Sequence, residues 1–404
     1  MLTESAAPAH QELHDIIRTR IRPRLAEIEC CRNSRELQSH ATYRELEPLL
    51  ETVLRTPQVG DFRSGREEAK ERYRFVAWNV ERGTQLDGQI EALLCHPHLR
   101  EADVLLITEA DIGMARSGNR DVARTLAREL GMQYAFVPSY ISLVKGSGVE
   151  RMVDGENDLG LHGDAILSRY SLSRISAIPL KNGIDKFAAR ERRLGTSTAI
   201  VADVHLPGLP VTAASIHLDA HSTQRHRRDQ MRDILLRLDT DLPVVLGGDW
   251  NTTTYNSSGA LPAILGFWLR VFLGVDYVIR NHYLHPYRFF ERDLFRLLEA
   301  HGFDYRKCNV LGERTIRYDV DDPRAHGSLM EWVPAWCFPF IRWSLRNHNG
   351  QCPLKLDWFA TRGVECAEPK VLHEFREDRE IPLSDHDPIC VDVLNPAYSK
   401  RQYV

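Results

Sequence analysis

Short apolar segments alternate with helical patterns along the chain from Tyr73 onward. Two segments repeat apolar residues at spacings of three and four, which predicts helices over 119–130 and 222–238. Asn119 and Ser222 are candidates to cap their first turns, and Gly131 ends the first helix. Alternation of this kind predicts an α/β or α+β fold with a large sheet content. The apolar segments read RFVAWN, DVLLITE, QYAFVP, DAILS, STAIVADVHL, VTAASIHL and LPVVLGGD.

The segments 197–206 and 210–217 are joined by the short sequence LPGLP. Two strand-like runs separated by so few residues predict an antiparallel hairpin. The sheet is therefore expected to be mixed, with both parallel and antiparallel neighbours.

Two regions differ from this pattern. In residues 1–72, Leu46, Leu49, Leu50 and Val53 form one helical face, and residues 57–72 have the polar composition of a linker. We interpret this region as a helical N-terminal extension packed on a main domain over 73–396, in preference to a partner-binding arm. Residues 252–350 form an insertion rich in aromatics with one clear helix over 291–300, and sheet-like segments resume at 356–361 and 388–393.

Composition narrows the class of protein. The 404 residues are 43% hydrophobic and 27% charged, which excludes disordered and fibrous proteins. The net charge of −4 gives no global attraction to nucleic acid, although a local cleft could still bind it. The eight cysteines form no CxxC pair, which argues against a disulfide scaffold or a zinc ribbon.

Targeting signals are not evident. The N-terminal residues lack a basic start followed by an apolar segment, and the most apolar stretch, 260–279, carries Arg270 and Asp276. That stretch falls short of the ~18 uninterrupted apolar residues that a spanning helix needs. We therefore expect no transmembrane segment and a cytoplasmic location.

Several apolar runs end in one polar residue that could perform chemistry. A strand end places such a group at the rim of a sheet, where ligands usually bind. Carboxylate and amide oxygens suit Mg²⁺ or Mn²⁺ better than zinc. The candidate residues are Asn79, Glu109, His217, Asp249 with Asn251, Asp357, and the SDHDP sequence that contains Asp385 and His386.

A divalent cation, a carboxylate that activates water and imidazoles facing an anion are what phosphoester hydrolysis requires. Each residue alone has another interpretation: Asn79 or Glu109 could be a turn former, and SDHDP a loop with an Asx turn. The presence of all these residues in one chain, in this order, is more specific evidence than any one of them alone. The chain has no GxSxG sequence and no Gly-rich P-loop, which disfavours acyl transfer and nucleoside triphosphate hydrolysis.

The motifs WNVERG, LLITEAD, GDAILSR, SIHLD, GGDWNT, LDWFATRG and SDHDPI resemble the endonuclease/exonuclease/phosphatase superfamily. The resemblance spans 73–251 and 354–393 and implies a four-layer sandwich of two packed mixed β-sheets flanked by helices. It implies that Asn79 and Glu109 hold the cation, with Asp385 as a further ligand, and that Asp249 activates water, while Asn251 fixes that water or the phosphate. It further implies that His386, oriented by Asp357, and His217 contact the phosphate.

Three further positions match the family less well. Asp164 stands where the family often has an Asn, and a carboxylate there adds negative charge beside a phosphate. Arg192 and Arg193 precede a strand where family members often place a phosphate-contacting Arg. Their alternative interpretation is a solvated charged turn.

The resemblance implies a hydrolase of phosphodiesterase or nuclease type that depends on Mg²⁺ or Mn²⁺. The family cleaves nucleic acids, phospholipid headgroups and small phosphoesters, so the substrate stays open, and protein partners are unknown. Two alternatives are a lipid-headgroup or inositol-phosphate phosphoesterase at a membrane surface and a catalytically silent binding protein. The insertion could stack bases, touch lipid or, as we favour, pack over the core. Trp332, Trp336 and Trp343 are its candidates for substrate selection.

Overall fold

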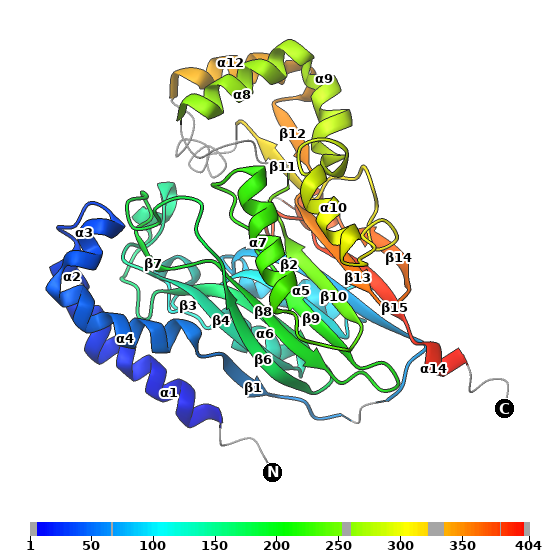
Figure 1. The fold of residues 1–404 in the computed structure, drawn as a ribbon, viewed down its shortest axis with the longest axis horizontal. Helices are drawn as coiled ribbons and strands as arrows, with labels where there is room; N and C mark the ends of the chain where they lie inside the picture. The colour runs from blue at the N-terminus through cyan, green and yellow to red at the C-terminus, as the bar shows by residue number, and fades with distance from the viewer. Residues whose placement is uncertain (1–5, 66–67, 253–259, 322–334, 380, 400–404) are drawn as a thin grey trace.

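Apolar residues at alternate positions of strand β2 (Arg72–Arg82) divide between two cores. Phe75 and Ala77 belong to a core between two β-sheets, whereas Val76 and Trp78 belong to a core between the sheet and a layer of helices. A strand that is buried on both faces must lie inside a layered structure. The computed structural model, which describes residues 6–65, 68–252, 260–321, 335–379 and 381–399, has this arrangement (Figure 1).

The larger sheet has eight strands in the order β1-β4-β5-β3-β2-β15-β14, and β7 also pairs with β4. Strands β2 and β3 are parallel, and their neighbours are antiparallel. The bounds are β1 (Gln58–Asp61), β3 (Val104–Ile112), β4 (Gln133–Ser142), β5 (Leu161–Ser168), β7 (Arg193–Gly195), β14 (Cys366–Val371) and β15 (Ile389–Leu394).

The smaller sheet has the order β13-β10-β9-β8-β6. Strands β8 and β9 form the predicted antiparallel hairpin, and β9 and β10 are parallel, so the expectation of mixed sheets is confirmed. Gly248 has φ +132°, and a Cβ there would lie 2.3 Å from the carbonyl oxygen of Ile216, so the second glycine of GGDWN permits this close approach. The bounds are β6 (Leu172–Pro179), β8 (Thr198–Val204), β9 (Val211–Ser215), β10 (Val244–Asp249) and β13 (Asp357–Arg362).

Helices complete the four layers. One group packs on the larger sheet: α1 (Ala6–Ile16), α2 (Leu25–Ile28), α3 (Ser34–Ser39), α4 (Ala41–Arg55), α5 (Leu86–Cys95) and α6 (Val122–Leu130). Helices α7 (Gln224–Arg237) and α10 (Arg292–Ala300) pack on the smaller sheet (Figure 1). The short α13 (Glu374–Glu377) and α14 (Pro396–Ser399) flank β15 in sequence. Short 3₁₀ or π-helical turns are Ile17–Ile21, Arg22–Arg24, Ala115–Ser117, Gly148–Met152, Ile279–Tyr283, Pro286–Arg288, Ala335–Cys337 and Arg346–His348.

Both predicted helix starts are displaced. Asp121, not Asn119, caps α6, since its side chain accepts a hydrogen bond from Arg124 N. Asn119 instead adopts φ +55° and bonds the loop at Glu156 and Asp158. The cap of α7 is Thr223, one residue after the predicted Ser222.

The N-terminal helices share a core with the larger sheet, and Leu46, Leu50 and Val53 are buried in it. The segment 57–72, which has a linker composition, contains an edge strand: β1 pairs antiparallel with β4 from Gln58 to Asp61. The sequence did not predict this strand because its formation depends on pairing with β4. A short polar edge strand has no strong alternation of apolar and polar residues of its own.

The insertion forms a lobe at one end of the molecule (Figure 1). It contains α8 (Ala260–Leu273), α9 (Val275–Val278), α12 (Phe338–Ser344) and β11 (Ile316–Asp319), which pairs with β12 (Gln351–Leu354) directly after the insertion. Packing over the core is right for Tyr287, which lies against the core of the smaller sheet. Tyr283 is buried in a separate core of the lobe, and Trp336 and Trp343 lie on the surface. Trp332 lies outside the described residues. Across the described ranges, no helix has the length and apolar character needed to cross a membrane.

Candidate active site

Strand ends from both sheets bring the predicted site residues together. Asn79 lies near the end of β2 and Glu109 in β3, whereas His217 follows β9 and Asp249 ends β10. The side-chain Nδ2 of Asn79 donates to Asp249 Oδ2 at 3.2 Å, a hydrogen bond that joins the two sheets. Because the sheets pack face to face, this rim collects polar groups from both of them.

Asp249 is the centre of the site. Its Oδ2 lies 3.6 Å from His217 Nε2 and 3.7 Å from His386 Nε2. Asn251 orients it, since its backbone N–H donates to Oδ1 at 2.9 Å and its Nδ2 lies 3.3 Å from Oδ2. Burial raises the pKa of Asp249; His386 and His217 oppose this increase, and Asp357 adds to it. A buried carboxylate of raised basicity is suited to accept a proton from water.

The imidazole of His386 is held by Asp357, whose Oδ2 lies 2.7 Å from its Nδ1. Burial alone would lower the pKa of His386, but Asp357 and Asp249 raise it well above its ordinary value. The backbone of the SDHDP loop is fixed as well, because the Ser384 hydroxyl donates to the Asn79 carbonyl at 2.6 Å and accepts from His386 N. The arrangement presents a cationic Nε2–H toward the site.

Glu109 has φ +57° and faces two cations. Its carboxylate oxygens lie 3.8 Å from Arg82 Nε and 3.8 Å from His217 Nε2, beyond hydrogen-bond distance. Burial favours the neutral form, yet Arg82 and His217 bring the pKa of Glu109 well below its ordinary value. The carboxylate is therefore ionised without a close hydrogen-bond partner from either cation, as a metal ligand should be.

Another group of potential ligands lies next to it. Among the described residues, Asp249, Asp357 and His386 present ligand atoms within 4.8 Å of one another. The His386–Asp357 hydrogen bond already commits one atom of each residue to the other. By contrast, the carboxylate of Glu109 lies 3.8 Å from both Arg82 and His217, so its oxygens stay available as ligands.

Asp164 lies under Glu109 and accepts a hydrogen bond from its backbone N–H at 3.2 Å. Burial raises the pKa of Asp164 to about 7, against the opposing charge of His217. A large share of this carboxyl is thus neutral near neutral pH, which reduces the repulsion that an Asp at an Asn position would impose on a phosphate.

Asp385 faces a neighbouring cavity of 230 Å³, which Arg82 and Tyr318 also line. Its carbonyl accepts from Arg376 Nη1 at 2.5 Å. Burial raises the pKa of Tyr318, and the charges of Asp385, Asp249 and Glu109 raise it further, so this phenol lies close to the site. Sequence reasoning missed Tyr318 because it belongs to the insertion, which carries no family motif.

The two adjacent arginines have different positions. Arg193 lies over the Tyr140 ring at 5.3 Å and lines a 110 Å³ cavity together with Glu109, Asp164 and His217. Arg192 donates to the carbonyl oxygens of Glu29 and Cys31 in the N-terminal extension and lies over the Phe187 ring. For both residues, contact with phosphate stays a prediction.

Replacing Arg192 with Ala is expected to loosen the N-terminal extension, because two backbone carbonyls lose their charged donor. Amide hydrogen exchange over residues 25–31 should rise severalfold, measured against Arg190→Ala, a change of an exposed arginine in the same turn. Unchanged exchange together with a raised KM would instead support contact between Arg192 and the substrate.

A buried network of charges adjoins the site and was not anticipated. Arg116 bonds Asp111 at 2.8 and 3.0 Å and Glu191 at 2.9 Å, and His162 lies 2.8 Å from Asp111. Glu150 links Arg116 to Arg82, which faces Glu109. Asp111 follows Glu109 in β3 after an irregularity in the register between Ile107 and Ala110, so strand alternation did not indicate where its side chain lies.

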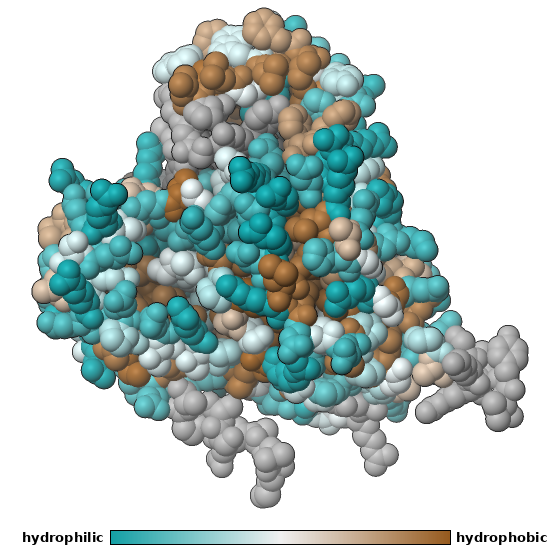
Figure 2. Space-filling model, in the orientation of Figure 1, coloured by the Kyte–Doolittle hydropathy of each residue, from teal (hydrophilic) through white to brown (hydrophobic). Residues whose placement is uncertain are grey.

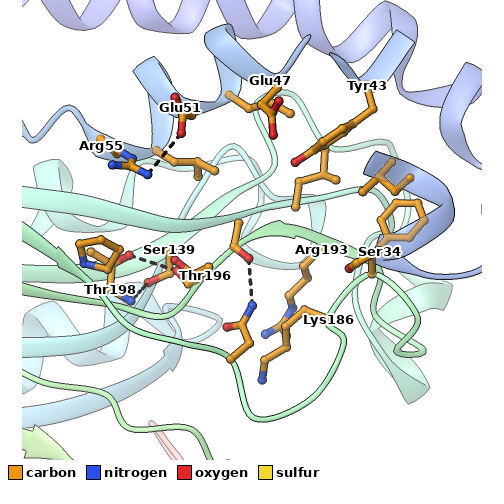
Figure 3. Close-up of a pocket in the computed structure, with 18 of the residues that line it drawn as sticks. Ser34, Tyr43, Glu47, Glu51, Arg55, Ser139, Lys186, Arg193, Thr196 and Thr198 are labelled. Atoms are coloured by element: carbon orange, nitrogen blue, oxygen red, sulfur yellow. Dashed lines mark hydrogen bonds and ion pairs between the residues drawn. The ribbon is translucent and has the colours of Figure 1, made fainter. Parts of the chain in front are cut away.

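A larger cavity of 320 Å³ lies between α4 and the strands β4 and β7. In Figure 3, Tyr43, Glu47 and Glu51 extend from α4 above Ser139, Thr196 and Thr198. Its lining includes Ser139, Lys186 and Arg193, which also line the 110 Å³ catalytic cavity. The N-terminal extension therefore forms one wall of a space that adjoins the site.

Two packed mixed sheets with a carboxylate–histidine site at their common rim define a DNase I-like α/β sandwich. The sequence profile described as Endonuclease/Exonuclease/phosphatase family matches residues 76–386, and the chain belongs to this family. Members of the family are hydrolases that act on phosphoester bonds. No curated protein matches the chain.

Solved structures of low sequence identity are similar to the chain. An endonuclease/exonuclease/phosphatase from Beutenbergia cavernae is 15% identical with a TM-score of 0.46, over 80% of this chain and 72% of that one. A family protein from Leptotrichia buccalis is 14% identical with a TM-score of 0.46, over 80% and 99%. The human Nocturnin catalytic domain with bound sulfate is 15% identical with a TM-score of 0.43, over 84% and 97%.

Proposed function

We propose that the chain is a divalent-metal-dependent phosphoester hydrolase of phosphodiesterase or nuclease type. The observation that carries the proposal is the buried line of Asp357, His386, Asp249 and His217, with successive separations of 2.7, 3.7 and 3.6 Å. A basic carboxylate between two imidazoles can accept a proton from water on one side of a phosphate whose oxygens the imidazoles bind.

Each residue has one role in this scheme. Asp249 accepts the proton of the attacking water, and Asn251 fixes the orientation of that carboxylate. His386 and His217 donate to phosphate oxygens as negative charge builds, and Asp357 keeps the His386 ring in place. Attack occurs in one step, so no side chain bonds covalently to phosphorus.

Asn79, Glu109 and Asp385 would hold the cation, with Mg²⁺ or Mn²⁺ as the ions that suit these oxygen donors. When bound, the cation would neutralise phosphate oxygens in the transition state. The proposed ligands fit because Glu109 is held ionised and has cations only at 3.8 Å. Asp385 is the least closely associated of the three, as it faces the adjoining cavity.

A panel of substrates with Mg²⁺ or Mn²⁺ tests the proposal directly. The arms are single-stranded and duplex DNA, RNA, a small chromogenic diester, and phospholipid headgroup esters. Metal-dependent turnover of any diester supports the proposed hydrolase function. The substrate that is cleaved fastest identifies the substrate class. Binding without turnover in every arm would favour the silent binding protein.

Removal of divalent cations should abolish activity, and Glu109→Gln should weaken metal binding because the neutral amide loses the charge that attracts the ion. We expect at least about a tenfold rise in the Kd for Mn²⁺, measured by calorimetry independently of turnover. Glu299→Gln, a change of a surface carboxylate on α10, is the matched control. Unchanged Mn²⁺ affinity in Glu109→Gln would place the ion elsewhere, and full turnover in EDTA would refute the proposed function.

A further inference from the structure

Helix α8 in the insertion lobe exposes a continuous apolar face. Leu261, Leu265, Leu269 and Phe272 recur at spacings of four, four and three, so at 100° per residue they lie within an arc of about 80°. They are exposed, with Leu265 at 62% and Phe272 at 82%. One face of α8 is thus apolar along nearly its whole length and has no partner among the described residues that buries it.

Helix α12 and the turn before it extend this surface. Trp336, Phe340 and Trp343 have helical spacing and are all exposed, Trp343 at 55%. The two helices lie against each other, because the Trp268 ring of α8 contacts the Phe340 ring at 5.7 Å between centroids. Figure 2 shows the apolar residues gathered over α8 and α12 at the end of the lobe. Clustered apolar side chains of this extent mark an interaction surface.

The charges of these segments identify the partner. Residues 260–283 and 338–348 contain four arginines, Arg270, Arg280, Arg342 and Arg346, in a chain whose net charge is −4. Arg270 bonds Tyr283 and lies on the side of α8 away from the apolar arc, whereas Arg280 and Arg346 are exposed. Asp276 is their single acid, and it pairs with His348. Arg342 pairs with Asp321 of the adjoining segment, and Arg346 lies 4.7 Å from the centroid of the exposed Trp343 ring. Exposed leucine and tryptophan side chains with arginine beside them are the groups that enter a lipid headgroup layer.

We propose that α8 and α12 dock the protein on the surface of an anionic phospholipid bilayer. The apolar face enters the headgroup region, and the exposed Arg280 and Arg346 bind the acidic lipid phosphates. This inference goes beyond the proposed function, since it concerns where the protein binds and not which bond it cleaves.

The base of the lobe connects this surface to the site. Asp387 N donates to Thr315 O at 2.8 Å, and Ile316 forms a β-bridge with His386. Tyr318, two residues further along β11, lines the cavity that Asp385 faces. A lobe anchored on the catalytic loop places the site at a fixed position relative to the bilayer.

Co-sedimentation with vesicles tests the proposal. The wild-type protein should bind vesicles of phosphatidylcholine with phosphatidylglycerol more tightly than phosphatidylcholine alone, and salt should weaken the preference. Leu265→Glu and Trp343→Ser should each lower the bound fraction about tenfold, because charge or polarity replaces inserted apolar surface. Leu236→Glu, on α7 and 71% exposed, is the matched control and should bind as the wild type does.

Circular dichroism confirms that each variant is folded, and the vesicle measurement requires no catalytic activity. Failure of the folded wild type to bind either vesicle would overturn the proposal, as would an equal loss in Leu236→Glu. Sedimentation velocity supplies the remaining outcome. A wild-type dimer that Leu265→Glu dissociates, without vesicle binding, would assign the face to a second copy of the chain and overturn the lipid assignment.

Discussion

Asp249→Asn is expected to reduce kcat by about 10²–10⁴-fold on any substrate that the wild type cleaves. The amide keeps the shape of the carboxylate, and its oxygen can still accept from the Asn251 backbone N–H. Its NH2 group cannot accept from Asn79 Nδ2, and the amide cannot take a proton from water. Burial and the neighbouring Asp357 raise the basicity of this carboxylate, and that contribution is lost as well. Steady-state kinetics with saturating metal measure the effect.

Asp203→Asn is the matched control for this change. Asp203 is also a buried aspartate in the smaller sheet, but it bonds Thr212 and not the site residues. We expect kcat of this variant to stay within a few-fold of the wild type. If Asp249→Asn retains wild-type turnover while its thermal unfolding is unchanged, the proton acceptor is another group.

His386→Ala should also slow turnover by about 10²–10⁴-fold, because a cationic donor to the phosphate is removed. Asp357→Asn should cost about 10²-fold or more, since the ring loses the acceptor that orients it. The double variant should be at most a few-fold slower than His386→Ala, because Asp357 acts mainly by orienting His386 and its charge only adds to the basicity of Asp249. A double-mutant cycle on kcat measures this non-additivity.

Another histidine–carboxylate pair serves as control. His373 Nδ1 lies 2.7 Å from Asp387 Oδ2, the same separation as in the His386–Asp357 pair. His373→Ala should leave kcat within a few-fold of the wild type. Additive losses in Asp357 and His386 variants would show that Asp357 has a separate role and is not a positioning residue.

Most of the central fold was predictable because β-strands buried on both faces carry strong local signals. The apolar runs ending in Asn79 and Asp249 are strands β2 and β10, and the sheet topology brings these two side chains to 3.2 Å. Parallel and antiparallel pairing followed from connection length, as the β8–β9 hairpin shows. The local signals did not show which strand ends meet in space. The family resemblance supplied that information for ends that lie far apart in sequence.

The parts that could not be predicted depend on tertiary contacts. Helix α8 has apolar residues on several sides, so its sequence has little helical periodicity. The buried Arg116 gives no local signal either, since its partners Asp111 and Glu191 are joined to it only by folding. Asn119 and Asp121 are both good caps by composition, and the loop contacts of Asn119 decide between them.

The part of the chain that matches the family is shorter than the part that builds the larger sheet. Similarity ends at residue 386, yet β15, which follows it, lies between β2 and β14. Similarity begins at residue 76, after β1 and the helices that supply Leu46 and Leu50 to the shared core. A fragment trimmed to the similar region would detach β14, leave the edge of β4 open to pairing with other chains and uncover an apolar surface. A recombinant fragment of this protein therefore has to include every strand of the larger sheet. A fragment cut at the ends of the sequence match is expected to aggregate.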